Sequence, residues 1–240
     1  MKISVVVPAF NEEALLPESL RSIRAAMAAF AERGWEAELV VCDNNSTDRT
    51  AEIARQAGAA VVFEPVNQIA RARNSGARAA SGGWLVFVDA DSWPSPELFA
   101  DVCREIEAGC LAGGSTVAYR DAPLSVRVAI GVWNRMSRIN RWAAGSFIFC
   151  EAAAFREAGG FSEELYAGEE IDLFGRLKRL ARRRRRPIRI LHRHPLRTSD
   201  RKVGLYGWRP LLVFMGKTLV TGGRNLRSRD ECYTWYDGRR

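Results

Sequence analysis

The chain has 240 residues, of which 47% are hydrophobic, and a formal net charge of +8. This length allows one large domain with a substantial core or two small ones. No uninterrupted apolar stretch is long enough to span a bilayer, and a strand pattern starts directly at residues 2–7, so neither a membrane span nor a signal peptide is predicted. The five cysteines are odd in number and lack metal-ligand spacing, which is typical of free thiols in a reducing compartment. We therefore expect a soluble, cytoplasmic protein.

Much of the positive charge lies in one run of arginines, residues 182–186. Such a run suits an anionic membrane surface or a phosphorylated substrate, and it is also compatible with a solvated helix end, the commoner outcome. No aromatic residues interleave these arginines and no nucleic-acid-binding motif accompanies them. No nucleic-acid partner is therefore predicted.

The first half of the chain alternates strand and helix patterns. Strands are expected at 2–7, 38–42, 60–63 and 84–88, and helices at 17–31, 50–57 and 69–80. This order is typical of a mostly parallel, Rossmann-like α/β sheet flanked by helices on both faces.

The second half mixes further strands and helices. Helices are expected at 96–107, capped by Ser95, and at 124–139, 152–157 and from 169 onward, with strands at 111–117, 147–150 and 188–191. In the 124–139 helix, Val126, Ile130, Trp133 and Met136 share one face, a spacing that favours core packing over a lipid-binding surface. A further amphipathic helix at 208–220 is expected to fold back on the domain or to rest on a membrane.

Acidic residues follow two of the buried strands. Asp43 ends the second strand, and Asp89 and Asp91 follow the fourth. In an open α/β sheet, ligands bind at the carboxyl ends of the strands, and two carboxylates there suit a divalent cation and its phosphate. The alternative is an ordinary structural role, with Asp43 to Asp48 forming an Asx turn and helix cap, and Asp89 and Asp91 capping a turn.

Five motifs in register resemble those of family 2 glycosyltransferases with the GT-A fold. The match extends from about residue 3 to about residue 180. Its motifs are Val5-Val6-Val7-Pro8-Ala9-Phe10-Asn11-Glu12, Asp43-Asn44-Asn45-Ser46-Thr47-Asp48, Ala70-Arg71-Ala72-Arg73-Asn74-Ser75-Gly76-Ala77, Asp89-Ala90-Asp91, and Gly159-Gly160-Phe161-Ser162-Glu163 with Gly168-Glu169-Glu170-Ile171-Asp172-Leu173.

The resemblance implies a role for each matching position. The residues that would line the nucleotide pocket are Pro8, Ala9, Phe10 and Glu12. Asp43 would read the base, and Arg71 or Arg73 would approach the base or the diphosphate. Asp89 would face the ribose and the metal, and Asp91 would be the main ligand of Mn²⁺ or Mg²⁺. The chain departs from the family pattern at Asn44, where a second Asp is frequent.

The acidic cluster at 169–172 opens a helix, so its simplest role is stabilisation of the helix N-terminus. In the family context, one carboxylate takes the proton of the attacking acceptor hydroxyl. Glu170 is the expected base, in place of the family's more usual Asp, and Glu169 is the next candidate. His194 is a further candidate metal ligand, the alternative being a surface histidine in an arginine-rich loop.

We thus expect a single-domain GT-A glycosyltransferase of the hexosyltransferase type, metal-dependent and inverting. Residues 1–204 would form the domain, with a nucleotide-sugar half at about 1–95 and an acceptor half at about 96–204, and residues 205–240 a basic, aromatic extension packed on the domain or on a membrane. Its partners would be a nucleoside diphosphate sugar and a hydroxyl acceptor, which could be a glycan, a lipid-linked molecule or a small molecule. Peripheral contact at the inner membrane face is also expected.

The alternatives are a non-catalytic nucleotide-sugar or anionic-surface binding protein on this fold, or a nucleotidyltransferase. A nucleotidyltransferase is expected to have a basic, glycine-rich phosphate loop, which residues 8–11 do not resemble.

Overall fold

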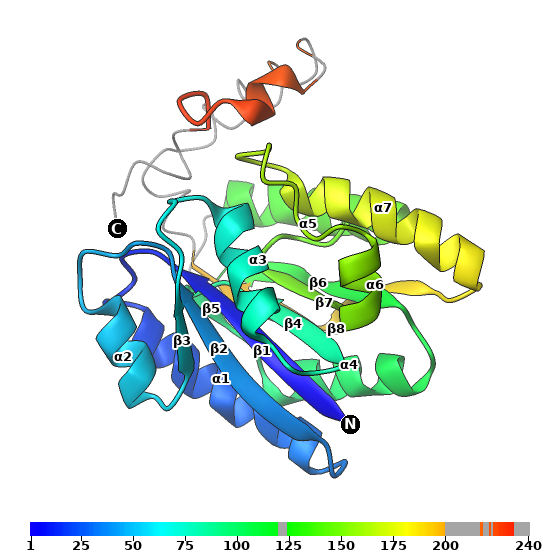
Figure 1. The fold of residues 1–240 in the computed structure, drawn as a ribbon. Coiled ribbons are helices and arrows are strands. Elements are labelled where there is room, and N and C mark those ends of the chain that lie inside the picture. The colour runs from blue at the N-terminus through cyan, green and yellow to red at the C-terminus, as the bar shows by residue number, and fades with distance from the viewer. Residues whose placement is uncertain (120–123, 200–216, 218–220, 222, 233–240) are drawn as a thin grey trace.

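The structure, a computed structural model, describes residues 1–119, 124–199, 217, 221 and 223–232. Figure 1 shows a sheet flanked by helices. The strands are β1 (Lys2–Ala9), β2 (Glu36–Asp43), β3 (Ala60–Phe63), β4 (Trp84–Val88), β5 (Ser92–Trp93), β6 (Ala112–Tyr119), β7 (Phe147–Glu151) and β8 (Ile188–Thr198). The helices are α1 (Leu16–Ala31), α2 (Thr50–Gln56), α3 (Ile69–Ala79), α4 (Pro96–Glu107), α5 (Leu124–Asn140), α6 (Ala152–Glu157) and α7 (Glu169–Arg184), followed by a short 3₁₀ helix, η1 (Arg224–Arg227).

The strands form one sheet in the order β3-β2-β1-β4-β7-β6-β8-β5. The pairs within β3-β2-β1-β4 are parallel, as is β6 with β8, whereas β7 runs antiparallel to both of its neighbours and β5 is antiparallel to β8. The predicted α/β class and mostly parallel sheet are confirmed. The order places the carboxyl ends of β1, β2 and β4 side by side, which brings together the polar residues that follow them.

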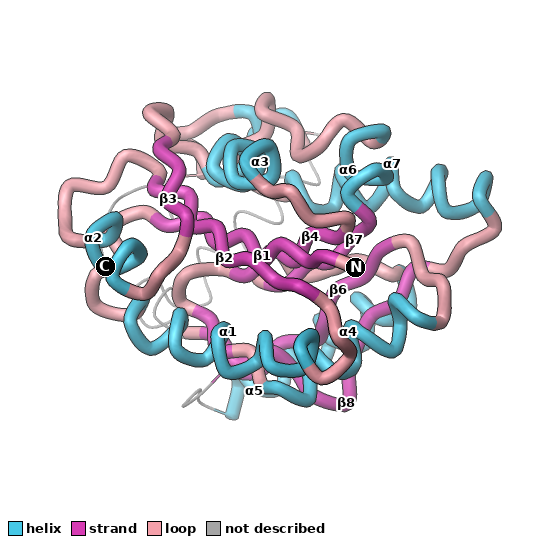
Figure 2. Tube along the Cα trace, turned by 60° about the horizontal axis from the view of Figure 1, so that its bottom comes forward, coloured by secondary structure: helices cyan, strands magenta, loops and turns pink. Residues whose placement is uncertain are grey.

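Helices cover both faces of the sheet. Figure 2 shows α3, α6 and α7 on one side and α1, α4 and α5 on the other. Two apolar cores follow this division: one includes Phe30, Phe99 and Phe147 beneath α1 and α4, and the other includes Phe87 and Phe161 beneath α3, α6 and α7. Burial of these large rings stabilises the sandwich at roughly 25 cal/mol per Å² of apolar surface.

The expected helix boundaries agree with the structure to within one or two residues. Ser95 caps α4 as predicted, because its side chain accepts a hydrogen bond from Leu98 N at 3.2 Å. All five cysteines are buried and free. No helix among the described residues is both long and apolar enough to cross a bilayer.

Three features differ from the sequence-based expectations. The last strand does not end at Leu191 but continues through a bulge to Thr198, where it pairs with the unpredicted two-residue strand β5. Met136 does not share the core face of α5, since 44% of its surface is exposed, whereas Ile130 and Trp133 pack against the core. Of the helix expected at 208–220, only Lys217 lies within the described residues, and the next described residue is Thr221.

Candidate active site

A cavity of about 70 Å³ opens at the carboxyl edge of β1 and β4. It is lined by residues from the ends of β1, β2 and β4 and from the start of α3: Pro8, Ala9, Phe10, Glu12, Asn44, Ile69, Ala72, Asp89, Ala90 and Asp91. Four predicted nucleotide-pocket residues and both predicted metal carboxylates therefore line one space. This is the switch point of the sheet, where the α/β architecture places ligands.

The loop after β1 is fixed by the loop after β2. Asn11 adopts φ 50°, and its Oδ1 accepts a hydrogen bond from Thr47 N at 2.8 Å. Glu12 N donates to Thr50 Oγ1 at 2.8 Å, and Glu13 N donates to Asp48 Oδ2 at 3.0 Å. Because the donors are backbone groups, these bonds set the path of residues 10–13 and hold the cavity wall in place.

Asp43 and Asn44 have different tasks. Asp43 Oδ1 accepts a hydrogen bond from Ser46 N at 3.1 Å, which is the Asx turn considered as its structural alternative. Asn44 donates through Nδ2 to the carbonyls of Glu64 and Val66, at 3.2 and 2.6 Å, and accepts from Gln68 N at 2.9 Å. An aspartate is unable to donate these two bonds, so the loop in this conformation requires Asn44 at the position where the resemblance led us to expect Asp.

Arg73 joins the two predicted acidic sites. Its guanidinium donates to Glu169 Oε1 at 2.7 Å, to Asp89 Oδ1 at 2.9 Å and to the carbonyl of Gly145 at 2.8 Å. The side chain is 3% exposed. Burial lowers the pKa of this guanidinium, but the charges of Asp89, Glu169 and Glu170 outweigh burial and raise the pKa, so that it stays ionised. This geometry directs the Arg73 guanidinium toward protein carboxylates.

Glu170 stands next to this ion-pair cluster. Burial raises the pKa of its carboxyl to about 7, with a further increase from the charge of Glu169, against an opposing effect of Arg73. A Cβ atom at Gly145 would lie 3.3 Å from Arg73 Nη2 and 3.4 Å from Glu170 Cδ, so the glycine lets both side chains approach. A carboxylate with a pKa near 7 is well matched to proton transfer at neutral pH.

Asn74 attaches α3 to the glycine-rich segment before α7. Its side chain forms a two-way bridge with the backbone of Phe161, accepting from N and donating to O, each at 2.9 Å. Gly160, at φ 67°, is needed because a Cβ atom there would lie 2.8 Å from Asn74 Oδ1. Arg71 binds the same segment through Glu163 at 3.1 Å. The third and fifth sequence motifs thus form one structural unit.

The donor set suits a hard divalent cation. Asp89 and Asp91 line the cavity together, and carboxylate oxygens are preferred ligands of Mg²⁺ and Mn²⁺. Within the described ranges, no group of three or more His, Cys, Asp or Glu side chains is placed to hold a metal ion. Two carboxylates without a protein cage fit a cation that completes its shell with substrate phosphates and water.

His194 does not join this site. Its Nδ1 lies 3.0 Å from Oδ2 of Asp101, a buried residue of α4, whereas Asp89 and Asp91 line a cavity that His194 does not reach. The extension of β8 explains the difference, because the histidine lies within this strand instead of in a loop turned toward the metal. The structure thus places His194 beside Asp101, and its role as a metal ligand stays a prediction.

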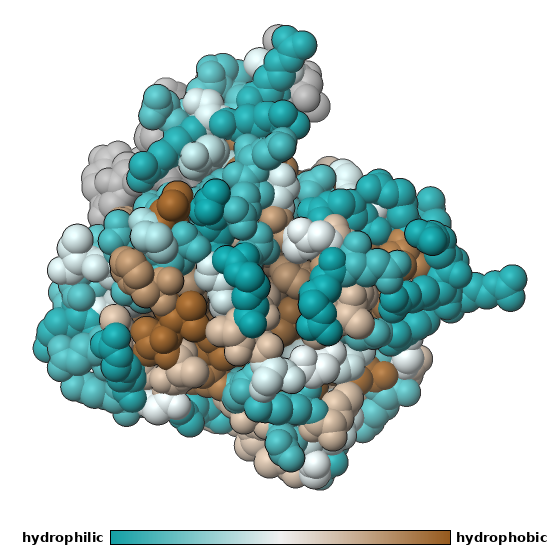
Figure 3. Space-filling view, viewed as in Figure 1, coloured by the Kyte–Doolittle hydropathy of each residue, from teal (hydrophilic) through white to brown (hydrophobic). Residues whose placement is uncertain are grey.

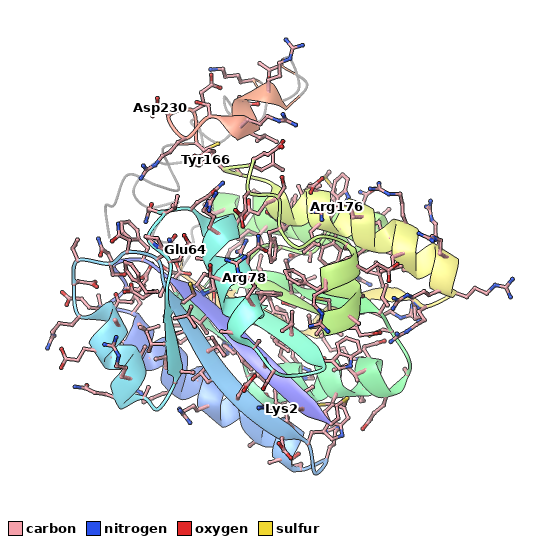
Figure 4. All side chains as sticks on the ribbon, in the orientation of Figure 1. Lys2, Glu64, Arg78, Tyr166, Arg176 and Asp230 are labelled. Atoms are coloured by element: carbon pink, nitrogen blue, oxygen red, sulfur yellow. The ribbon has the colours of Figure 1, made fainter. Side chains whose placement is uncertain are left out.

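Sequence reasoning missed several supporting residues. Gln68 donates to the carbonyls of Glu163 and Leu165, at 2.9 and 3.0 Å. Glu64 accepts from Ser75 Oγ at 2.5 Å, and the labelled side chains of Glu64 and Arg78 lie near each other in Figure 4. Gly145 also carried no recognisable signal. These residues act through contacts distant in the chain, which spacing alone does not reveal.

The described C-terminal residues contact the acceptor-side loop. Tyr166 N donates to the carbonyl of Leu226 at 2.7 Å, and Figure 4 shows Tyr166 next to the segment that carries Asp230. Burial raises the pKa of the Cys232 thiol, and the negative charge of Glu169 raises it further. Cys232 therefore lies near Glu169. Residues 224–232 therefore border the start of α7.

Comparison with known proteins identifies the family. The model of the family described as "Glycosyl transferase family 2" matches residues 4–159. The chain belongs to glycosyl transferase family 2. An undecaprenyl-phosphate 4-deoxy-4-formamido-L-arabinose transferase of Pseudomonas aeruginosa is 36% identical over 130 residues, covering 49% of this chain and 36% of the relative. The validoxylamine A glucosyltransferase of Streptomyces hygroscopicus is 28% identical over 218 residues, covering 73% of this chain and 51% of the relative.

Solved structures show the fold of this family 2 chain. The mannosyltransferase PcManGT from Pyrobaculum calidifontis, in complex with GDP-Man and Mn²⁺, superposes with a TM-score of 0.66 at 21% identity, covering 88% of this chain and 61% of that one. TarS 1-349 of Staphylococcus aureus gives a TM-score of 0.63 at 23% identity, covering 89% of this chain and 65% of that one. The fold is GT-A, as expected. The chain spans from about a third to about half of the length of the curated relatives described above.

Proposed function

We propose that this protein is a metal-dependent, inverting glycosyltransferase that moves a sugar from a nucleoside diphosphate sugar to an acceptor hydroxyl. The observation that carries the proposal is the junction at Arg73, which holds Asp89 of the cavity and Glu169 of the acceptor side within hydrogen-bond distance of one guanidinium. This proximity supports a site in which Asp89 would help to hold a metal and a carboxylate at the start of α7 would act as the base. Family membership supplies the reaction class.

The cavity wall is proposed to bind the donor nucleotide. Pro8, Ala9, Phe10 and Glu12 would enclose the nucleoside, with Asp43 toward the base and Asp89 toward the ribose. Arg71, which is 38% exposed, keeps its expected role near the base or the diphosphate, although it also pairs with Glu163. For Arg73 we propose a positioning role beside its expected approach to the base or the diphosphate, because its Nη1 and Nη2 groups donate to Asp89, Glu169 and the carbonyl of Gly145.

Asp91, with Asp89, is proposed to hold Mn²⁺ or Mg²⁺ together with the donor diphosphate. When bound, the cation would offset the negative charge that develops on the departing nucleoside diphosphate. PcManGT in complex with GDP-Man and Mn²⁺, and a Mycobacterium tuberculosis glucosyl-3-phosphoglycerate synthase in complex with Mg²⁺ and UDP, share the fold and support this assignment.

Glu170 is proposed as the catalytic base and Glu169 as the alternative. In its ionised form, the Glu170 carboxylate would accept the proton of the acceptor hydroxyl. The acceptor oxygen would form a bond to the anomeric carbon while the bond from that carbon to the diphosphate oxygen breaks. Attack from the face opposite the leaving group inverts the configuration at the anomeric carbon. Glu169 is less suited to this role, since its Oε1 is bound to Arg73 and its side chain is 5% exposed.

The proposed location is cytoplasmic, with peripheral contact at the inner face of the membrane. The Pseudomonas relative is named as acting on undecaprenyl phosphate, which makes a lipid-linked acceptor one candidate beside a glycan or a small molecule. We further propose that residues 1–204 form one catalytic domain with a nucleotide half and an acceptor half, and that 205–240 form an extension that packs against it. The bond between Tyr166 and Leu226 supports this packing.

Calorimetric titration with UDP, GDP, CDP and dTDP tests the donor site. Each nucleotide is titrated with Mn²⁺ and again with EDTA, into wild type and into Asp91→Asn. The proposal predicts that one nucleotide binds, that EDTA weakens its binding, and that Asp91→Asn removes the effect of the metal. Equal binding with and without metal in both proteins contradicts the metal role. No binding by any of the four favours a non-catalytic binding protein on this fold.

A further inference from the structure

The outward face of α5 carries an apolar stripe. Val128, Val132, Met136 and Ile139 are 60%, 56%, 44% and 70% exposed. Their spacing of three and four residues places them on one side of the helix. These four make up half of the large apolar side chains that the described part of the chain exposes to solvent. Such a concentration on one helix marks an interaction surface.

The opposite face of α5 fixes the orientation of this stripe. Ile130 and Trp133 pack against the core below the sheet. Asn134 forms two hydrogen bonds with the backbone of Val117, accepting from N at 3.1 Å and donating to O at 2.9 Å. Rotation of the helix to bury the stripe would break these contacts. The stripe therefore lies on the side of α5 that faces away from the core.

A basic groove borders the stripe. It has a volume of about 850 Å³ and is lined by residues of α4, α5 and the first half of β8. Figure 2 shows α4 and α5 on the same side of the sheet. Its arginines are Arg104, Arg135, Arg138, Arg141, Arg189 and Arg193, and Ile139 of the stripe also lines it. Arg104 and Arg189 pair with Asp101 and Glu105. The other four form no ion pair with any carboxylate that the structure describes.

The arginine run at 182–186 is used differently. Arg184 pairs with Glu151 and Glu157, and Arg186 binds Glu151 together with the carbonyls of Gly109 and Cys110. Basic residues at the end of α7 also interact favourably with its helix dipole. Figure 3 shows this end of α7 as a hydrophilic projection. Two of the five arginines of the run, Arg184 and Arg186, are therefore engaged in contacts within the fold.

The combination of the groove arginines and an adjacent apolar stripe selects one kind of partner. A soluble polyanion would neutralise the arginines but leave the stripe in water. A second copy docked through the same face would bring like charges together. The surface of an anionic bilayer offers phosphates to the arginines and an acyl boundary to Val128, Val132, Met136 and Ile139.

We infer that α5 and the groove beside it form a docking surface for anionic membranes, with the apolar stripe inserted at the headgroup boundary and the groove arginines on lipid phosphates. This assigns a surface to the peripheral membrane contact proposed above and rests on that part of the proposed function. Binding to vesicles requires neither donor nor acceptor. Its result is therefore separable from that of glycosyl transfer.

Sedimentation of the full chain with vesicles tests the inference. Vesicles of phosphatidylcholine with about a third phosphatidylglycerol are compared with pure phosphatidylcholine, at low and high salt. The stripe variant is Val132→Ser with Ile139→Ser, and the charge variant is Arg135→Gln with Arg138→Gln. Two controls change similar residues elsewhere: Phe63→Ser, at a side chain that is 60% exposed on β3, and Arg182→Gln with Arg183→Gln on α7. Circular dichroism and binding of the nucleotide identified by calorimetry confirm that each variant folds.

We expect wild type to bind the anionic vesicles and to be released by salt. The charge variant should lose about 30-fold in partition coefficient and the stripe variant at least about tenfold, while both controls stay within about twofold of wild type. The inference is overturned if wild type does not bind the anionic vesicles. It is also overturned if either control loses binding while both α5 variants bind like wild type. A dimer that the stripe variant converts to monomer, without vesicle binding, would instead identify a second copy as the occupant.

Discussion

Arg73 and Asp89 are joined by a hydrogen-bonded ion pair of 2.9 Å, and the other end of the same guanidinium binds Glu169 at 2.7 Å. Asp89 follows β4, and Glu169 begins α7, so one side chain from α3 links two segments that are distant in the chain. The link fixes Asp89, a proposed metal ligand, relative to Glu169 at the start of α7. We therefore expect both the stability and the proposed chemistry of the site to depend on this junction.

Replacement of Arg73 by Met should strongly destabilise the protein. It would leave the buried Glu169 and the partly buried Asp89 without their cation, and removal of one partner of a buried ion pair costs about 3–5 kcal/mol. Urea unfolding measures the change. The matched control is Arg71→Met, whose exposed pair with Glu163 should contribute at most about 1 kcal/mol. Equal effects of the two variants would show that the junction is not a buried ion-pair cluster.

Glu170→Gln should make the protein more stable at alkaline pH. The folded-state pKa of this carboxyl is raised to about 7 from an ordinary value of 4.5. The folded protein therefore holds its proton where the unfolded chain has lost it, and stability falls as pH rises from about 4.5 to about 7. The glutamine introduced by the substitution would not titrate, so the variant should not undergo this loss of stability. Its free energy of unfolding should equal that of wild type below about pH 4 and exceed it by about 1–3 kcal/mol at about pH 8. Unfolding measured at both pH values checks this, and an advantage that is the same at both would contradict the raised pKa.

Asn44→Asp should destabilise the loop at 64–68, although this change moves the sequence toward the usual family pattern. The carboxylate would lose the two donated bonds to the carbonyls of Glu64 and Val66 and would lie close to these oxygens. We expect a loss of about 2–4 kcal/mol at about pH 7, smaller at about pH 4, where a protonated Asp regains one donor. Denaturation at the two pH values measures it. A neutral effect would show that the side-chain network of Asn44 is dispensable.

Gly160→Ala and Gly175→Ala should have effects of opposite sign. Gly160 has a positive φ, and a Cβ atom there would contact Asn74 Oδ1, so alanine should cost about 1–3 kcal/mol. Gly175 lies within α7, and a Cβ atom there would have no neighbour within 4 Å outside its own helix turn, so alanine should stabilise the helix by about 0.5–1 kcal/mol. Thermal unfolding compares both with wild type. Stabilisation by both substitutions would mean that the contact between Asn74 and the glycine segment is loose.

The sheet and the place of the cavity were predictable from the sequence. Apolar strand runs followed by polar residues at 8–12, 43–48 and 89–91 are local signals, and the β-α-β order brings such strand ends to one edge. The start of α4 was also predictable, because Ser95 caps it through a local hydrogen bond.

Side-chain partners across the fold were not predictable. Arg73 was expected near the nucleotide, yet its partners Asp89, Gly145 and Glu169 lie up to 96 residues away in sequence. His194 was expected near the metal from the family resemblance, whereas the structure places it within β8 and in contact with Asp101. On α5, periodicity indicated one apolar face, but the helix carries two, and only packing decides that Ile130 is covered while Met136 is exposed.

Removal of the acceptor proton by Glu170, at a site where the donor is already bound, is the step on which the proposed mechanism rests. One kinetic comparison tests it. The substrate is a nucleoside diphosphate sugar that carries the nucleotide found to bind, and water serves as the acceptor. The rate at which the nucleoside diphosphate is released is compared between wild type and Glu170→Gln. We expect turnover to fall by about 10²- to 10⁴-fold with nucleotide affinity unchanged, and we expect wild type to show an acid limb of kcat/KM near pH 7. Turnover by Glu170→Gln within a few-fold of wild type, with the acid limb retained, would contradict a role for Glu170 as the base.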